Sequence, residues 1–127
     1  MVLLWIALGG ALGALARYGV SGWVHSWVGT DFPWGTFVVN ATGSLLIGLL
    51  LRSLEGLPWG PDVRAFFAIG LLGAFTTFST YSYETLALLE DGEWLRAGFY
   101  SLGSLAIGLL AVSAGLALAE LALQGRG

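Results

Sequence analysis

Residues 65–84 read AFFAIGLLGAFTTFSTYSYE, a stretch that is long and apolar enough to cross a bilayer but changes character halfway along. Five of the seven residues from Thr76 to Ser82 carry an aliphatic hydroxyl, and Gly73 precedes them. Ser and Thr hydroxyls compete for backbone hydrogen bonds, and Gly lowers helix propensity. We therefore expect a spanning helix that breaks in mid-membrane, where freed backbone groups are tolerated only if they line a cavity or bind an ion.

The composition of the whole chain supports a membrane protein. Of its 127 residues, 57% are hydrophobic and 10% are charged, and the mean hydropathy is +0.82. Soluble domains carry roughly a quarter charged residues. The absence of Cys excludes a disulfide scaffold and a thiolate metal site, and the few basic residues exclude a nucleic-acid partner. We expect a multi-pass protein of the inner (plasma) membrane of the cell, surrounded by the lipid bilayer.

Four stretches reach the length of about 20 apolar residues that a spanning helix needs. They cover approximately residues 3–27, 34–51, 65–83 and 97–119. We interpret the uncharged N-terminal stretch as a retained first span rather than a signal peptide, because it lacks a basic n-region. The sequence thus predicts an all-α membrane protein, with residues 1–127 forming a single integral membrane domain of four transmembrane helices and the third helix broken.

The orientation of these spans in the membrane is weakly specified. Arg52, Arg64 and Arg126 lie on the side of the termini, and Arg96 lies on the other side. Positive charges in short loops set topology, so this distribution leaves two alternatives: a slight preference for termini inside, or insertion in both orientations. Four helices also enclose little interior for a polar path. A path between two bundles is more natural, which favours an oligomer.

Three polar side chains at membrane depth are functional candidates, because such groups are costly there. Arg17 in the first span and Glu84 at the end of the third lie in the same half of the membrane. Two roles stay open for them: an ion pair with each other, or attraction of anions into a water-filled vestibule. Asn40 lies near the middle of the second span and needs a hydrogen-bond partner on another helix or on a permeating species.

Two aromatic side chains follow the expected break. Phe78 and Tyr81 are three residues apart and share a face if this segment is helical. Ring edges are electropositive, so a pair of edges can flank a small anion that has lost its water, although core packing is the commoner role. Together with Asn40 and the hydroxyl run, the pair favours an ion path. Carbonyls freed at the break are oxygen ligands suited to an alkali cation.

These features resemble the CrcB/Fluc fluoride channel family over essentially the whole chain. The resemblance implies an antiparallel, dual-topology homodimer that has two fluoride pores and one structural Na⁺ at its centre. The matching segments are Gly9-Gly10 through Gly13-Ala14 to Arg17-Tyr18, Gly35-Thr36 through Val39-Asn40 to Gly43-Ser44, Gly70 through Gly73 to Thr76-Thr77-Phe78-Ser79-Thr80, and Tyr100 with Ser104.

The resemblance also implies roles for individual residues. The backbone carbonyls of Gly73 and Thr76 match the Na⁺ ligands of the family. Tyr81 stands where the family usually has a second Phe, and its additional hydroxyl offers a donor to fluoride. The residues that fall on pore-lining positions of the family are Asn40, Phe78, Ser79, Thr80, Tyr100 and Ser104.

The function expected from the resemblance is that of an ion channel: passive, fluoride-selective export that reduces fluoride toxicity. The alternative is a Na⁺- or H⁺-coupled secondary anion transporter, because broken helices and a Na⁺ site also suit coupled exchange. A small multidrug-type exporter would need a carboxylate in the first span, where this chain has Arg17. One His, no Cys and no paired carboxylates at membrane depth predict that the protein is not an enzyme.

Overall fold

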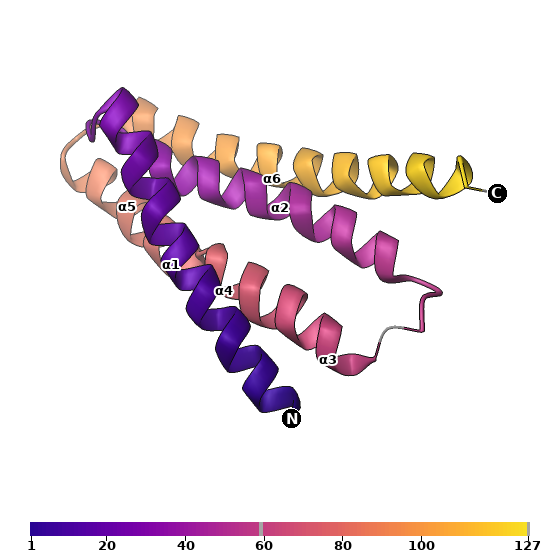
Figure 1. Ribbon diagram of the computed structural model, residues 1–127. Coiled ribbons are helices and arrows are strands. Elements are labelled where there is room, and N and C mark those ends of the chain that lie inside the picture. The colour runs from indigo at the N-terminus through magenta and orange to yellow at the C-terminus, as the bar shows by residue number, and fades with distance from the viewer. Residues whose placement is uncertain (59, 127) are drawn as a thin grey trace.

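The computed structural model describes residues 1–58 and 60–126, and all regular structure in these ranges is helical (Figure 1). Four helical spans are long and apolar enough to cross a membrane, which confirms the predicted all-α architecture. Three spans are single helices: α1 (Val2–Val28), α2 (Trp34–Leu54) and α6 (Trp94–Gln124). The third span consists of α3 (Pro61–Arg64), the π-helix η1 (Ala65–Leu72), α4 (Gly73–Phe75) and α5 (Phe78–Glu90).

The third span breaks where the sequence predicts it. Thr76 and Thr77 have extended backbone conformations, with φ/ψ of −82°/157° and −149°/124°. The Thr77 side chain accepts a hydrogen bond from the Thr80 amide and so caps α5. The helical part starts at Pro61, earlier than the predicted residue 65, because Pro is well suited to the first turn of a helix. The π-helix before the break was not anticipated from the sequence.

The spans pack mainly as two pairs, α1 with η1 and α2 with α6 (Figure 1). Small residues permit both contacts. Gly9 and Gly13 are buried against the main chain of η1, and a Cβ at Gly13 would collide with the Leu71 carbonyl. Gly48 and Gly115 bring the main chains of α2 and α6 equally close. The Gly9–Gly13 pair therefore serves packing within the chain.

Large apolar side chains are exposed along every span, and the buried apolar residues include one small cluster. That cluster comprises Phe32, Leu88, Ala97 and Tyr100, at the end of the molecule where the connectors α1–α2 and α5–α6 meet. Exposed apolar surface of this extent is stable only against lipid or another apolar surface. With four spans of membrane-crossing length and composition, the chain is a multi-pass membrane protein.

Candidate functional site

A cavity of about 650 Å³ lies beside the break and collects most of the predicted site residues. Its walls come from α2, from the third span on both sides of the break, and from α6. The predicted residues among its lining are Asn40, Gly73, Thr76, Phe78, Tyr81 and Ser104. Segments far apart in the sequence thus converge on one space, whose mainly apolar lining includes the polar side chains of Asn40, Thr76 and Ser104.

The Asn40 side chain holds the break in place. Its Nδ2 donates to the Thr77 carbonyl at 3.0 Å, and its Oδ1 accepts from the Thr77 amide at 2.8 Å. The amide group thereby replaces the helical partners that Thr77 loses in its extended conformation. Of the two partners that the sequence leaves open for Asn40, another helical span is the one seen.

The carbonyls of Gly73 and Thr76 have lost their usual amide partners. In a continuous helix they would accept from the amides of Thr77 and Thr80, four residues further on. The Thr77 amide instead donates to Asn40, and the Thr80 amide donates to the Thr77 hydroxyl at 3.4 Å. Both residues line the cavity, so these oxygens fit the chemistry of an alkali-cation ligand.

Arg17, on α1, contacts the backbone of the third span next to the same break. Its Nε donates to the Ala74 carbonyl at 3.1 Å, 57 residues along the chain. The structure does not form the ion pair between Arg17 and Glu84 that was one of the two alternatives. Within the described residues, the only ion pairs are Arg52–Glu55 and Arg96–Glu93. Arg17 is therefore placed to satisfy a carbonyl that the break exposes.

Glu84 has hydroxyl partners instead of a basic one. Thr36 donates to the Glu84 carboxylate at 2.5 Å, and the Tyr100 hydroxyl approaches the same oxygen at 3.5 Å. Thr36 was not among the predicted site residues. A signal was present in the sequence, because Thr36 lies four residues before Asn40 and thus on the same face of α2. These three side chains form a polar group next to the aromatic rings of α5 and α6.

The aromatic rings form a continuous row. The centroids of Phe78 and Tyr81 are 5.8 Å apart, and those of Tyr81 and Tyr100 are 5.4 Å apart. Phe78 is 78% exposed, whereas Tyr100 is completely buried. The Tyr81 hydroxyl donates to the Ser101 carbonyl at 2.8 Å. Its proton is therefore engaged within the protein.

The remaining predicted residues differ in position. Ser104 lines the cavity, and its hydroxyl oxygen is buried without a hydrogen-bond partner among the residues that the structure describes. Ser79 is exposed, and the Thr80 hydroxyl bonds to Thr77 at 3.2 Å. Ser79, Thr80 and Tyr100 do not line the cavity. The ring of Tyr100 is buried and lies next to that of Tyr81, which does line it.

Comparisons with known proteins show which family this chain resembles. A family model described as "CrcB-like protein, Camphor Resistance (CrcB)" matches residues 4–116. A "Fluoride-specific ion channel FluC" of Thermus thermophilus is 59% identical, and the match covers 83% of each chain. A protein of that name from Acidobacterium capsulatum is 50% identical over 91% of this chain and 94% of its own. A third, from Syntrophotalea carbinolica, is 45% identical over 94% and 98%.

Proposed function

Because this chain belongs to the CrcB-like family, we propose that it is a fluoride-specific channel through which fluoride leaves the cell passively. Membership of a family of ion channels also means that the protein is not an enzyme. The observation that carries the proposal is the cavity beside the break, where Asn40, Phe78 and Ser104 meet. A small anion that enters a membrane needs such a set of donors and ring edges to replace its water.

The proposed path uses groups that the protein itself leaves available. The Ser104 hydroxyl has no partner among the described residues and can donate to fluoride. The exposed ring of Phe78 lines the same cavity and can present an electropositive edge. At the other end of the aromatic row, the hydroxyls of Thr36 and Tyr100 both contact the Glu84 carboxylate. We infer that fluoride passes from the cavity along the aromatic row toward these hydroxyls.

We further propose that a structural Na⁺ is held by the carbonyls of Gly73 and Thr76. The chemistry it supplies is a fixed positive charge beside the anion path. The support for this assignment is that the amides which would normally bond these oxygens are directed to Asn40 and Thr77. Two carbonyls are fewer than the oxygens that surround an alkali cation in a protein filter. A second copy that contributes the same two carbonyls would complete the site.

The second copy is proposed to lie antiparallel to the first. Its support is the open cavity between α2, α6 and the third span, and the apolar side chains exposed along all spans. We expect single-Cys reporters placed at either terminus of this Cys-free chain to be labelled from both sides of the membrane in roughly equal measure. Labelling from one side only, with full labelling after permeabilisation, would contradict the antiparallel dimer.

The experiment that tests the function is fluoride efflux from liposomes that contain only this protein. Fluoride should leave down its gradient once a K⁺ ionophore allows charge compensation, and chloride should stay inside. Efflux that proceeds equally without a Na⁺ or H⁺ gradient distinguishes a channel from the coupled anion transporter. If protein that is demonstrably inserted releases no fluoride, the proposed function is wrong.

Tyr81→Phe is expected to leave fluoride efflux within about twofold of the parent. The hydroxyl that it removes already donates to Ser101, so a permeating anion would not use it, and the ring is kept. The loss of this hydrogen bond should instead lower stability by about 0.5–1.5 kcal/mol. Efflux and thermal unfolding of the two proteins in detergent measure the two effects separately. A stable variant with strongly slowed efflux would mean that the hydroxyl serves fluoride directly.

A further inference from the structure

A second cavity, of about 890 Å³, lies where the connector of residues 29–33 meets the first turns of α6. It shares no lining residue with the cavity beside the break. Small-molecule sites commonly measure about 300–1,000 Å³, so this space is of ligand size. Its rim carries Trp34 and Trp94 at the ends of two spans, the level at which Trp side chains meet lipid headgroups.

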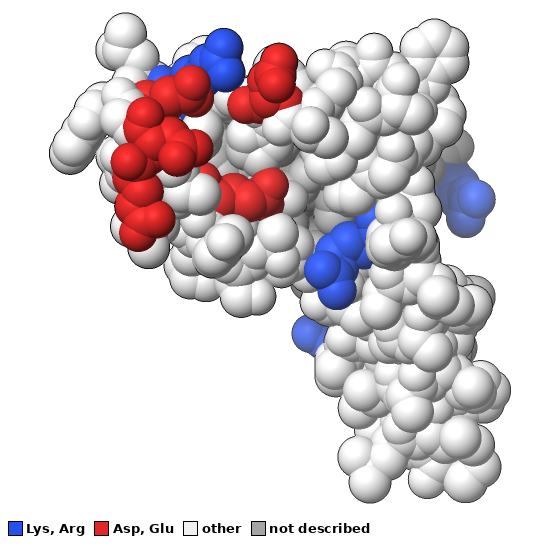
Figure 2. Space-filling view, turned by 90° about the vertical axis from the view of Figure 1, so that its left-hand side faces the viewer, with Lys and Arg blue, Asp and Glu red and all other residues white. Residues whose placement is uncertain are grey.

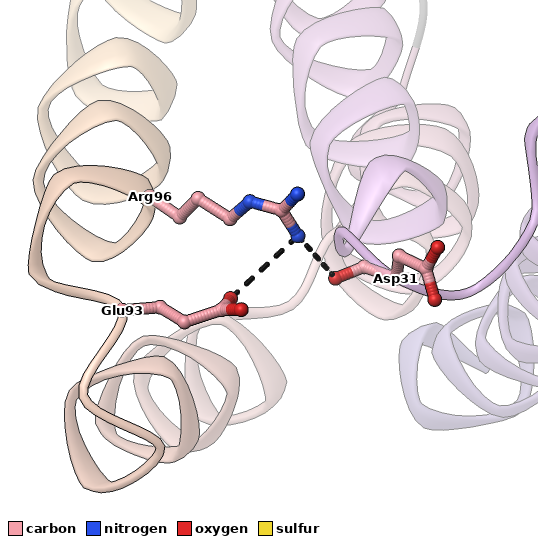
Figure 3. Close-up of polar contacts among 3 residues, drawn as sticks. All are labelled: Asp31, Glu93 and Arg96. Carbon is pink, nitrogen blue, oxygen red and sulfur yellow. Dashed lines mark hydrogen bonds and ion pairs between the residues drawn. The ribbon is translucent and has the colours of Figure 1, made fainter.

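Arg96 supplies the cationic group of this cavity (Figure 3). One terminal nitrogen of its guanidinium contacts the Asp31 carbonyl at 3.4 Å and the Glu93 carboxylate at 3.6 Å. Both contacts are long and solvent-exposed, so they hold the group weakly. The other guanidinium nitrogens have no protein partner among the described residues. Arg96 thus keeps donors for an anionic group such as a phosphate.

Acidic residues gather at the end of the molecule that carries Arg96; among them Asp31 lines the cavity and Glu93 contacts the guanidinium. Asp31, Glu90, Asp91 and Glu93 all belong to the two connectors at this end or to residues beside them, and Figure 2 shows acidic side chains gathered on the face in view. The Asp31 carboxylate points away from Arg96 in Figure 3 and has no ion-pair partner among the described residues. An anionic headgroup would be repelled here. A zwitterionic headgroup matches one guanidinium that has the carboxylates of Glu93 and Asp31 in its neighbourhood.

The wall of the cavity on α6 is apolar and open. Phe99 and Leu102 are 66% and 70% exposed, and both line it. Gly98 and Gly103 lie beside them, and a Cβ at either would meet no other atom within 4 Å. A groove of this kind, which runs from charged residues toward the apolar part of a spanning helix, fits an acyl chain below a headgroup.

We propose that this cavity binds one phospholipid of the phosphatidylethanolamine type. Arg96 holds its phosphate, the carboxylates of Asp31 and Glu93 receive its ammonium, and an acyl chain lies against Gly98 and Gly103. A primary ammonium has three N–H donors for these carboxylates, whereas the quaternary ammonium of phosphatidylcholine has none. Phosphatidylglycerol carries net negative charge and is disfavoured by the same carboxylates. The site does not depend on which ion the protein conducts.

The test is quenching of Trp94 by lipids brominated near the headgroup end of the acyl chain. The protein is reconstituted in vesicles in which phosphatidylethanolamine, phosphatidylcholine or phosphatidylglycerol is the brominated component at equal mole fraction. The signal of Trp94 is the difference between the parent and Trp94→Phe. Brominated phosphatidylethanolamine should compete for the site about tenfold better than the other two, the size expected for one charge-assisted hydrogen bond.

Two variants separate the headgroup from the groove. Arg96→Gln removes the guanidinium, and Gly103→Leu places a side chain in open space inside the cavity. Both should abolish the preference for phosphatidylethanolamine. Gly22→Leu, which also enters open space but lies outside the cavity, is the matched control and should keep it. Because a Cβ at Gly103 meets no other atom within 4 Å, Gly103→Leu tests the proposal even if Arg96→Gln does not fold.

Three results would overturn the proposal. Equal quenching by all lipids would mean ordinary boundary lipid. A preference for phosphatidylglycerol would mean that the carboxylates do not select the headgroup. No quenching of Trp94 by any lipid would mean that a second copy of the chain covers this face.

Discussion

Replacing Asn40 with leucine is expected to abolish fluoride efflux and to destabilise the protein at the same time. The Asn40 amide makes two hydrogen bonds to the Thr77 backbone, and leucine leaves both groups of Thr77 without partners. Each unsatisfied buried group costs about 1–3 kcal/mol. Displacement of the break should slow efflux by about a hundredfold or more, since each 1.4 kcal/mol added to a barrier lowers a rate about tenfold.

The matched control for this variant is Thr42→Leu. Thr42 lies two residues along α2, is exposed and does not line the cavity, so its replacement should leave efflux near that of the parent. Efflux from liposomes and thermal unfolding in detergent should be measured on both variants. An Asn40→Leu protein that unfolds earlier yet conducts normally would show that the amide supports the fold but not the path.

Phe78→Ile should reduce fluoride efflux by about tenfold. Isoleucine keeps the apolar bulk but has no electropositive ring edge, and an aromatic contact of this kind is worth about 0.5–1.5 kcal/mol. The side chain is 78% exposed and lines the cavity, so few packing contacts are lost with the ring. The reduction should therefore occur without a comparable fall in unfolding temperature.

Two further variants test whether efflux depends on an aromatic ring and on the place of that ring at the cavity. Phe78→Tyr keeps a ring at the cavity and should retain most of the efflux. Tyr83→Ile removes an exposed ring from the same helix outside the cavity and should have little effect. If Phe78→Ile and Tyr83→Ile conduct alike, ring edges do not contribute to permeation in this protein.

Features that depend on local composition could be derived from the sequence. A stretch of about 20 mostly apolar residues predicts each span. The structure has its four membrane-length helical spans at those stretches. The break is similarly local, because Thr76 and Thr77 follow Gly73 by three and four residues. The site residues came from polar groups at membrane depth and from the family resemblance. The cavity brings six of them together.

Other features were decided only by tertiary contacts. Asn40 had two kinds of partner open to it in the sequence, and its choice of Thr77, 37 residues away, follows from how α2 packs beside the third span. Arg17 was expected to pair with Glu84 or to attract anions, and it bonds to Ala74, 57 residues away. The π-helix of residues 65–72 has no local signature that we recognise.

The features that the sequence predicted depend on neighbouring residues, whereas the others depend on residues that are far apart in the sequence. Burial in a bilayer is a sum over consecutive side chains, so the sequence by itself determined that four helices cross the membrane and where the third one breaks. A hydrogen bond is directional and short, so the partner of a buried polar group depends on which distant helix comes within about 3 Å. That is why only the tertiary structure decided that the Tyr81 hydroxyl is engaged by Ser101 and that the carbonyls of Gly73 and Thr76 lose their amide partners.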